Sequence, residues 1–347
     1  MKFNILTLFI ACFLTTTAIA QVDRSKQPEP GPAPKINLGQ PDEFTLDNGL
    51  KVLVVENHKL PRVSASLIID NKPHAEEKPA TAALVSSLLG TGTENMSKDD
   101  FNEEIDFLGA NVSFGSESVY ASSLSKFFPR VMELMAEGAL KPKFTQEEFE
   151  AEKNKQIESL KSINKDVGSI ASRVSAALAY GANHPYGEFA TVENTEKVSL
   201  EDVKGFYNNY FKPANAYLVV VGDVKTSEVK KLAEKNFGSW EAGAPKEQDL
   251  PQVANVNETQ INLVDMPNAV QSELRLQNTI DLKMADEDYF PVLVANQILG
   301  GSFGSYLNMN LREDKGYTYG ARTSTGADKY ASRFVAQASV RNAVTDS

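Results

Sequence analysis

The feature that most constrains the fold of this chain is a pattern that occurs twice. A strand-like segment, an apolar helix, a glycine corner, a short helix and another strand follow one another in residues 63–116. The same succession recurs in residues 270–321, where the glycine corner reads GGSFG. Two copies of one α/β unit are therefore expected. The second copy, residues 259–347, is shorter than the first, so we expect it to be incomplete and the chain to be a fragment of a longer protein.

Turn and cap signals divide the rest of the chain into elements. Asp47, Asn48 and Gly49 predict the turn of a hairpin, with one strand starting near residue 44 and the following strand at 51–56. Helices are expected to start after the capping residues Ser97, Thr145 and Ser199. The other expected elements are a deeply buried helix at 80–89, helices at 128–137, 169–179, 227–237 and 286–299, and strands at 111–116, 120–125, 216–221, 259–265 and 270–279. We expect an N-terminal domain at 41–240, a linker at 241–258 and a C-terminal domain at 259–347.

The first twenty residues have the pattern of a signal peptide. Lys2 supplies the positive start, residues 5–14 are apolar, and Ala18-Ile19-Ala20 is a small-residue cleavage site. We expect an exported protein, periplasmic or envelope-associated, whose mature form starts at Gln21 and opens with a Pro-rich linker, residues 21–40. Lipidation at Cys12, the only cysteine, is the weaker alternative, because Phe9 suits a lipoprotein cleavage site poorly.

Composition and charge argue against some classes of function. The 347 residues carry a net charge of −11, which argues against nucleic acid as a partner. An apolar content of 41% is ample for a large core. No later segment has an apolar run long enough to span a bilayer, so we expect no membrane span in the mature chain.

The second glycine corner leads to a cation and a phenol on either side of one turn. Leu307 and Leu311 share a face of the short helix, which ends at Arg312, and Tyr319 lies in the next strand. This pair can present guanidinium donors and a hydroxyl to a peptide carbonyl or a carboxylate. The alternative is structural: Arg312 caps its helix and Tyr319 packs edge-on in the core. GGSFG matches neither common phosphate-loop pattern.

Several segments together resemble the pitrilysin / insulinase / mitochondrial processing peptidase family of inverted-motif zinc peptidases. They are FTLDNGLKVLVVENHKLPRVSASLIID, the HPYG loop, VSLEDVKGFYNNYFKPANAYLVVVGDV and ILGGSFGSYLNMNLREDKGYTYGA. The resemblance implies an α+β fold, an α/β sandwich of two homologous domains. Each domain would be a mixed or antiparallel sheet with helices packed on it, and the pair would form a clam shell around peptides.

The family's zinc motif is degenerate in this chain. An inverted H-x-x-E-H places two histidines on one helical face and a general base between them. Ala83 and Ser87 stand at the histidine positions, Ser86 stands at the base, and Ser159 stands at the later glutamate ligand. Outside this motif, His58, His74 and His184 have no spacing that suits a metal. We therefore expect no metal and no cofactor in this chain, with zinc in a partner subunit.

The resemblance also includes a second set of active-site residues, which does not bind zinc. Arg312 and Tyr319 match the paired Arg and Tyr that lie on the zinc-less subunit in two-chain members. There the pair contacts substrate and supports the oxyanion in the partner's site. The resemblance therefore implies a non-catalytic subunit, inactive alone, with a zinc-bearing homologous subunit and peptides as its partners. Gly300, Gly301 and Gly304 are expected to line the same substrate cavity, with close helix packing as the alternative.

Two other functions are alternatives to this subunit role. A non-enzymatic peptide-binding or scaffold protein of the cell envelope would also lack zinc ligands, and it could keep Arg312 and Tyr319 by inheritance. A self-sufficient zinc peptidase is disfavoured, because four substitutions remove the expected ligands and base together.

Overall fold

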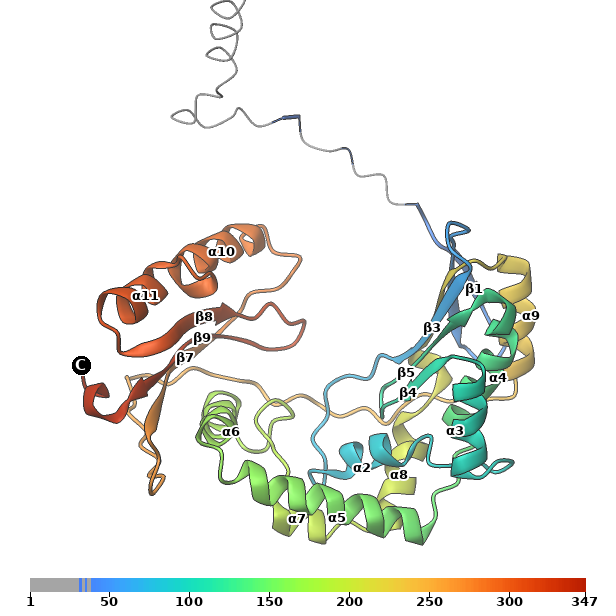
Figure 1. Cartoon of the computed structure of the whole chain (residues 1–347), viewed down its shortest axis with the longest axis horizontal. Helices are drawn as coiled ribbons and strands as arrows, with labels where there is room; N and C mark the ends of the chain where they lie inside the picture. Colours follow the sequence, from blue (N-terminus) through green and yellow to red (C-terminus); the bar gives the residue numbers. More distant parts are fainter. Residues whose placement is uncertain (1–30, 33–34, 36–38) are drawn as a thin grey trace, which may run out of the picture. The chain divides into compact units, whose positions relative to one another are not determined.

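A mixed six-stranded sheet with the order β1-β2-β6-β3-β5-β4 forms the first half of the fold in the computed structural model (Figure 1). β2 and β6 are parallel, and the other neighbours are antiparallel. The strands are β1 (Asp42–Thr45), β2 (Lys51–Glu56), β3 (Arg62–Ile69), β4 (Asn111–Phe114), β5 (Ser118–Leu124) and β6 (Ala216–Gly222). The structure describes residues 31–32, 35 and 39–347, so the proposed signal peptide and most of the Pro-rich linker lie outside the described residues.

The predicted hairpin joins β1 and β2. Gly49 has a φ of +95°, a conformation that favours glycine, and the side chain of Asn48 donates to the carbonyl of Phe237, 2.8 Å away. β2 and β3 alternate buried and exposed positions, and the central β6 contributes the fully buried Leu218 and Val220 to the core.

Helices cover this sheet and extend from it. α4 (Phe128–Leu140) and α9 (Thr226–Phe237) pack against the strands and against each other, and α3 (Lys98–Phe107) contacts α4 (Figure 1). α2 (Thr81–Leu88) packs against α5 (Gln146–Ile163) and α8 (Leu200–Tyr210). This half also contains the helices α6 (Val167–Tyr180) and α7 (Val192–Glu196).

The predicted caps are present at three helix starts. The hydroxyls of Ser97, Thr145 and Ser199 each accept a hydrogen bond from the backbone N–H three residues later. At Ser199 the Asp202 carboxylate also accepts from the Ser199 backbone N–H, which completes a capping box.

A second, antiparallel sheet repeats half of the first. Its order is β7-β9-β8, formed by β7 (Gln271–Ile280), β8 (Thr318–Thr325) and β9 (Ser332–Arg341). This order matches β3-β5-β4, and in both sheets two helical segments lie between the first strand and the second strand along the chain. In the second copy these segments are α10 (Tyr289–Asn296) and α11 (Tyr306–Asn308), which continue as π-helices over Gln297–Gly301 and Met309–Asp314. The topology thus supports the repeat seen in the sequence.

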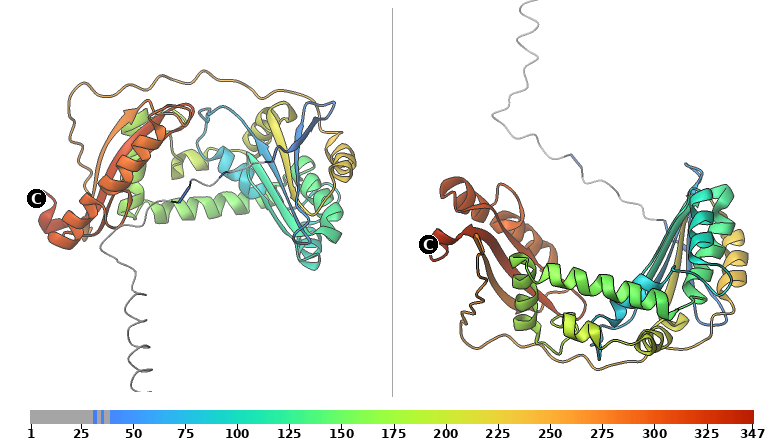
Figure 2. Two further views of the ribbon diagram at one scale, coloured as in Figure 1. Left: turned by 90° about the horizontal axis from the view of Figure 1, so that it is seen from above. Right: turned by 60° about the horizontal axis from the view of Figure 1, so that its bottom comes forward.

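Two helices lie on opposite faces of this second sheet. α10 contacts β8 on one face and α6 contacts β7 on the other (Figure 2). Leu307 and Leu311 pack with the buried Ala321, Ala338 and Val340, as their spacing predicted.

Two local predictions were wrong. Residues 259–265 form no strand but an exposed coil, in which Leu263 is 91% exposed, because no neighbouring strand among the described residues pairs with them. The helix at 81–88 is not deeply buried all round: Leu84, Val85 and Leu88 are buried, whereas Ala83 and Ser87 are exposed. An uncharged helix face therefore did not imply a buried one. Within the described part of the chain, no helix is long and apolar enough to cross a membrane.

Candidate substrate-contact site

The turn between the last helical segment and β8 has the form that the sequence predicted. Backbone N–H groups of Lys315, Gly316 and Tyr317 donate to the carbonyls of Asn310, Arg312 and Leu311. Gly316 has a φ of +61°, the left-handed conformation that commonly ends a helix. Arg312 therefore lies in the last turn of its helix and Tyr319 near the start of the strand.

Both side chains of this pair are available to a ligand. Tyr319 is 90% exposed, which contradicts the structural alternative that it packs in the core. The guanidinium of Arg312 lies over the ring of Phe303, 4.5 Å from its centroid, and its Nε is 3.4 Å from the Glu313 carboxylate. A cation held on an aromatic face keeps its in-plane donors free for a second partner. Arg312 and Tyr319 do not hydrogen-bond each other in this structure, so their joint use would be set by a ligand.

The three glycines of the corner differ in their surroundings. A Cβ on the buried Gly300 would lie 2.6 Å from the backbone nitrogen of Thr323, and one on Gly301 would lie 2.8 Å from Gln297 Oε1. A Cβ on Gly304 would meet nothing within 4 Å. Close packing of the π-helix against β8 accounts for glycine at Gly300. A cavity role for Gly301 and Gly304 stays a prediction.

The four residues that the resemblance predicts at degenerate zinc positions lie on two helices that pack together. Ala83 and Ser87 are one turn apart on the exposed face of α2, and the Ser87 hydroxyl donates to the Ala83 carbonyl, 3.0 Å away. Ser86 is half-buried; its hydroxyl donates to the carbonyl of Ala82 and accepts from the backbone N–H of Ser116. Ser159 is exposed on α5. Methyl and hydroxyl groups at these positions do not fit Zn²⁺, which takes imidazole, thiolate or carboxylate.

The histidines lie in three separate environments. His58 bonds Asp223 and Glu56, and the hydrogen bond to Asp223 contributes most to raising its pKa. His74 stacks on the ring of Tyr210. His184 is buried in the loop after α6; its Nδ1 accepts from the Tyr186 backbone N–H, and desolvation lowers its pKa. Among the described residues no three His, Cys, Asp or Glu side chains gather as a metal site.

A pair of carboxylates anchors the start of α2. Glu76 accepts a hydrogen bond from the Ala82 backbone N–H, 3.0 Å away, and the Glu188 carboxylate accepts from the Glu76 N–H, 3.0 Å away. Burial raises the pKa of Glu188 to about 7 and also raises the pKa of Glu76. Glu188 therefore links the loop after α6 to α2, the helix that carries Ala83, Ser86 and Ser87.

The Glu188→Gln variant should become more stable than the wild type as pH rises. The folded state binds a proton at Glu188 more tightly than the unfolded state does, so this contribution is complete below pH 4.5 and is lost as pH rises through about 7. Glutamine keeps the acceptor and does not ionise. Its advantage in the free energy of unfolding should grow by about 1–2 kcal/mol between pH 5 and pH 8, allowing for partial exposure. Urea unfolding at the two pH values measures it. Glu258→Gln, in exposed coil, is the control and should follow the wild type.

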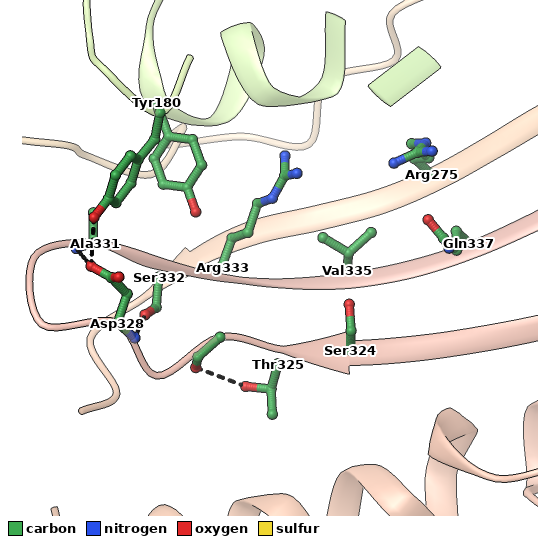
Figure 3. A pocket seen from close by; sticks show the side chains of 12 residues that line it. Tyr180, Arg275, Ser324, Thr325, Asp328, Ala331, Ser332, Arg333, Val335 and Gln337 are labelled. Carbon is green, nitrogen blue, oxygen red and sulfur yellow. Dashed lines mark hydrogen bonds between the residues drawn. The ribbon is translucent and has the colours of Figure 1, made fainter. Parts of the chain in front are cut away.

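The sequence analysis did not predict a polar cavity on the face of the second sheet that α6 contacts. The cavity has a volume of about 410 Å³ and lies between that face and the end of α6 (Figure 3). Its lining includes Arg275 and Arg333 from the sheet and Tyr180 and Tyr186 from the α6 end and the loop after it. The sequence does hold a signal for this cavity, because polar residues alternate at 271, 273, 275 and 277 and so give β7 one polar face.

The second sheet thus repeats part of the unit that forms the first sheet, and helices pack on both sheets. Two models of one family match consecutive parts of the chain: "Insulinase (Peptidase family M16)" at residues 51–185 and "Peptidase M16 inactive domain" at residues 197–346. The chain belongs to the M16 peptidase family, as the resemblance in the sequence indicated.

Its relatives include bacterial and mitochondrial proteins. An "Uncharacterized zinc protease YmxG" of Bacillus subtilis is 25% identical over 285 residues, which cover 80% of this chain and 68% of that protein. The rat mitochondrial-processing peptidase subunit beta is 22% identical over 308 residues, and the match spans 83% of this chain but only 60% of the rat protein.

Solved structures share the fold. The crystal structure of a peptidase M16 inactive domain from Pseudomonas fluorescens has a TM-score of 0.77 at 24% identity, over 87% of this chain and 74% of that one. The first half of the periplasmic protease PqqL from Escherichia coli has a TM-score of 0.65 at 18% identity, over 87% of this chain and 68% of that one. These likenesses establish the α+β fold.

Proposed function

We propose that this chain is the zinc-less subunit of a two-chain peptidase and that it supplies Arg312 and Tyr319 to the active site of a zinc-bearing homologue. The observation that carries the proposal is a contrast between two sites. Every expected metal position holds Ala or Ser, whereas backbone hydrogen bonds form the turn between Arg312 and Tyr319, and Tyr319 is 90% exposed.

The chemistry of the corner suits contact with a peptide backbone. A guanidinium offers five N–H donors and a phenol offers one O–H donor, and a carbonyl that becomes an oxyanion gains most from such donors. Stacking on Phe303 restricts the Arg312 side chain before substrate arrives, which lowers the entropy lost on binding. None of Ala83, Ser86, Ser87 and Ser159 has a side chain that can act as the general base for an attacking water.

The relatives support a peptidase context. One is named as a subunit of a processing peptidase, and others are named as zinc proteases. A scaffold role in the envelope is the competing outcome. The isolated chain should hydrolyse no peptide, whereas a mixture with its zinc-bearing partner should. Activity of the partner that is unchanged by adding this chain would favour the scaffold.

We also propose that the protein is exported and cleaved after Ala20. Support comes from the signal-peptide pattern of residues 1–20 and from the name of a structural neighbour, a periplasmic protease. Cell fractionation should place the mature protein in the periplasm or envelope, and N-terminal sequencing should begin at Gln21. A mature chain that begins at Cys12 with attached lipid would contradict this cleavage and establish the lipoprotein alternative.

A further inference from the structure

The polar face of the second sheet carries three arginines. Arg275 of β7 and Arg322 of β8 both lie opposite Gln337 of the central strand β9, so the three residues form one cross-strand row. Strand spacing puts the backbones of the two arginines about 10 Å apart. Arg333 lies further along β9 on the same face, and Figure 3 shows Arg333, Val335 and Gln337 projecting toward α6.

The described part of the chain gives these three arginines no carboxylate partner in an ion pair. Within the described part of the chain, none of the three is in an ion pair, although the whole chain has a net charge of −11. The Nε of Arg275 is buried and has no hydrogen-bond partner among the described residues. Buried cationic donors without partners are costly, and an anion that meets them recovers that cost.

Arg333 is held in place at the cavity wall. Its guanidinium donates to Gln277 Oε1, 3.1 Å away, and lies 5.5 Å from the centroid of the Tyr180 ring. Gln277 in turn donates to the carbonyl of Ser175 on α6. This network fixes Arg333 against α6.

The acidic groups near the cavity are already engaged. Asp328 accepts from the Tyr186 hydroxyl, 2.8 Å away, and from the Tyr330 backbone N–H. Glu273, on the same face of β7 as Arg275, accepts from the Ser339 hydroxyl. Glu273 partly offsets the Arg275 charge, but it forms no ion pair with it, so the donors of Arg275 stay free for a ligand.

From this geometry we propose that the cavity binds a carboxylate group of a peptide, with Arg275 and Arg333 as its cationic partners and Tyr180 and Tyr186 as its aromatic wall. Desolvation lowers the pKa of Arg275, and the guanidinium stays protonated, so an entering carboxylate meets a poorly solvated cation. The carboxylate could be the C-terminus of the peptide or an Asp or Glu side chain. That the ligand is a peptide rests on the proposed function, whereas the carboxylate site itself does not.

Binding to the isolated mature chain tests this assignment without the partner. Three N-terminally fluorescein-labelled probes are compared by fluorescence anisotropy: an alanine-rich peptide with a free C-terminus, its C-terminal amide, and the amide with one internal Glu. The free-acid peptide or the Glu-bearing amide should bind at least about tenfold more tightly than the plain amide. The first result identifies a C-terminal carboxylate and the second an acidic side chain. Equal affinity for all three overturns the proposal.

Variants locate the site. Arg275→Gln should reduce the preference for the carboxylate-bearing peptide by about tenfold, because the unpartnered guanidinium contributes little to folding and much to binding of the anion. Arg62→Gln makes the same charge change at an exposed strand start in the first sheet and should leave the preference intact. An equal loss in both variants would mean nonspecific attraction and overturn the proposal. This binding assay needs neither the zinc-bearing partner nor peptide hydrolysis, so failure of the carboxylate site and failure of the proposed subunit role remain distinguishable.

Discussion

Replacing Arg312 with alanine should lower the turnover of the two-chain mixture by about a hundredfold or more, the loss expected when one donor to a developing oxyanion is removed. The isolated chain should be inactive before and after the substitution. Because the side chain is only part-buried and stacks on Phe303, the variant should fold normally. Peptide hydrolysis measured at saturating amounts of the variant subunit gives the result directly.

Lys315→Ala is the matched control for Arg312. Lys315 is an exposed cation three residues further along the same turn, so its removal changes the local charge without touching the proposed contact. It should leave turnover within about twofold of the wild type, as expected for a surface substitution. Tyr319→Phe, which removes only the hydroxyl, should cost about tenfold. Normal turnover by the Arg312→Ala mixture would refute the role proposed for this residue.

Gly300→Ala should destabilise the second half of the fold by about 3 kcal/mol, near the upper end of overpacking penalties. The added methyl would lie 2.5 Å from Thr323 Oγ1 and 2.6 Å from the Thr323 backbone nitrogen. A backbone atom in a strand cannot move aside cheaply, so the π-helix must shift away from β8. Urea unfolding followed by circular dichroism measures the loss.

Gly304→Ala supplies the comparison. The new methyl meets nothing within 4 Å, and the free energy of unfolding should change by less than about 0.5 kcal/mol. If Gly300→Ala were as stable as Gly304→Ala, close packing would not be the reason for glycine at the corner, and the substrate-cavity role would gain support at Gly300.

Local signals predicted elements well where one strong physical rule acted. The Asp47-Asn48-Gly49 turn, the caps at Ser97 and Ser199, and the packing of Leu307 with Leu311 all depend on neighbours in sequence. Residues 259–265 have strand-like composition but no strand to pair with in the described residues, and a strand needs that partner. Propensity alone could not supply it.

The candidate sites show the same division. The resemblance could mark Arg312 and Tyr319, and the structure adds the 90% exposure of Tyr319 that removes the core-packing alternative. The arginine row could not be predicted, because it depends on the register that sets Arg275 and Arg322 opposite Gln337. Residues far apart in sequence acquire a shared function only once the register of their strands is known.

The most direct test of the zinc-less subunit is a pull-down of the full-length mature protein from its native envelope, with mass spectrometry and a zinc assay on the eluate. We predict a stoichiometric partner that carries an H-x-x-E-H motif, with zinc in the complex and none in this chain once it is separated. A metal-free protein recovered alone, or with unrelated envelope components, would contradict the two-chain peptidase and favour the scaffold. Zinc bound to the isolated chain would contradict the assignment of Ala83, Ser86, Ser87 and Ser159 as a degenerate metal site.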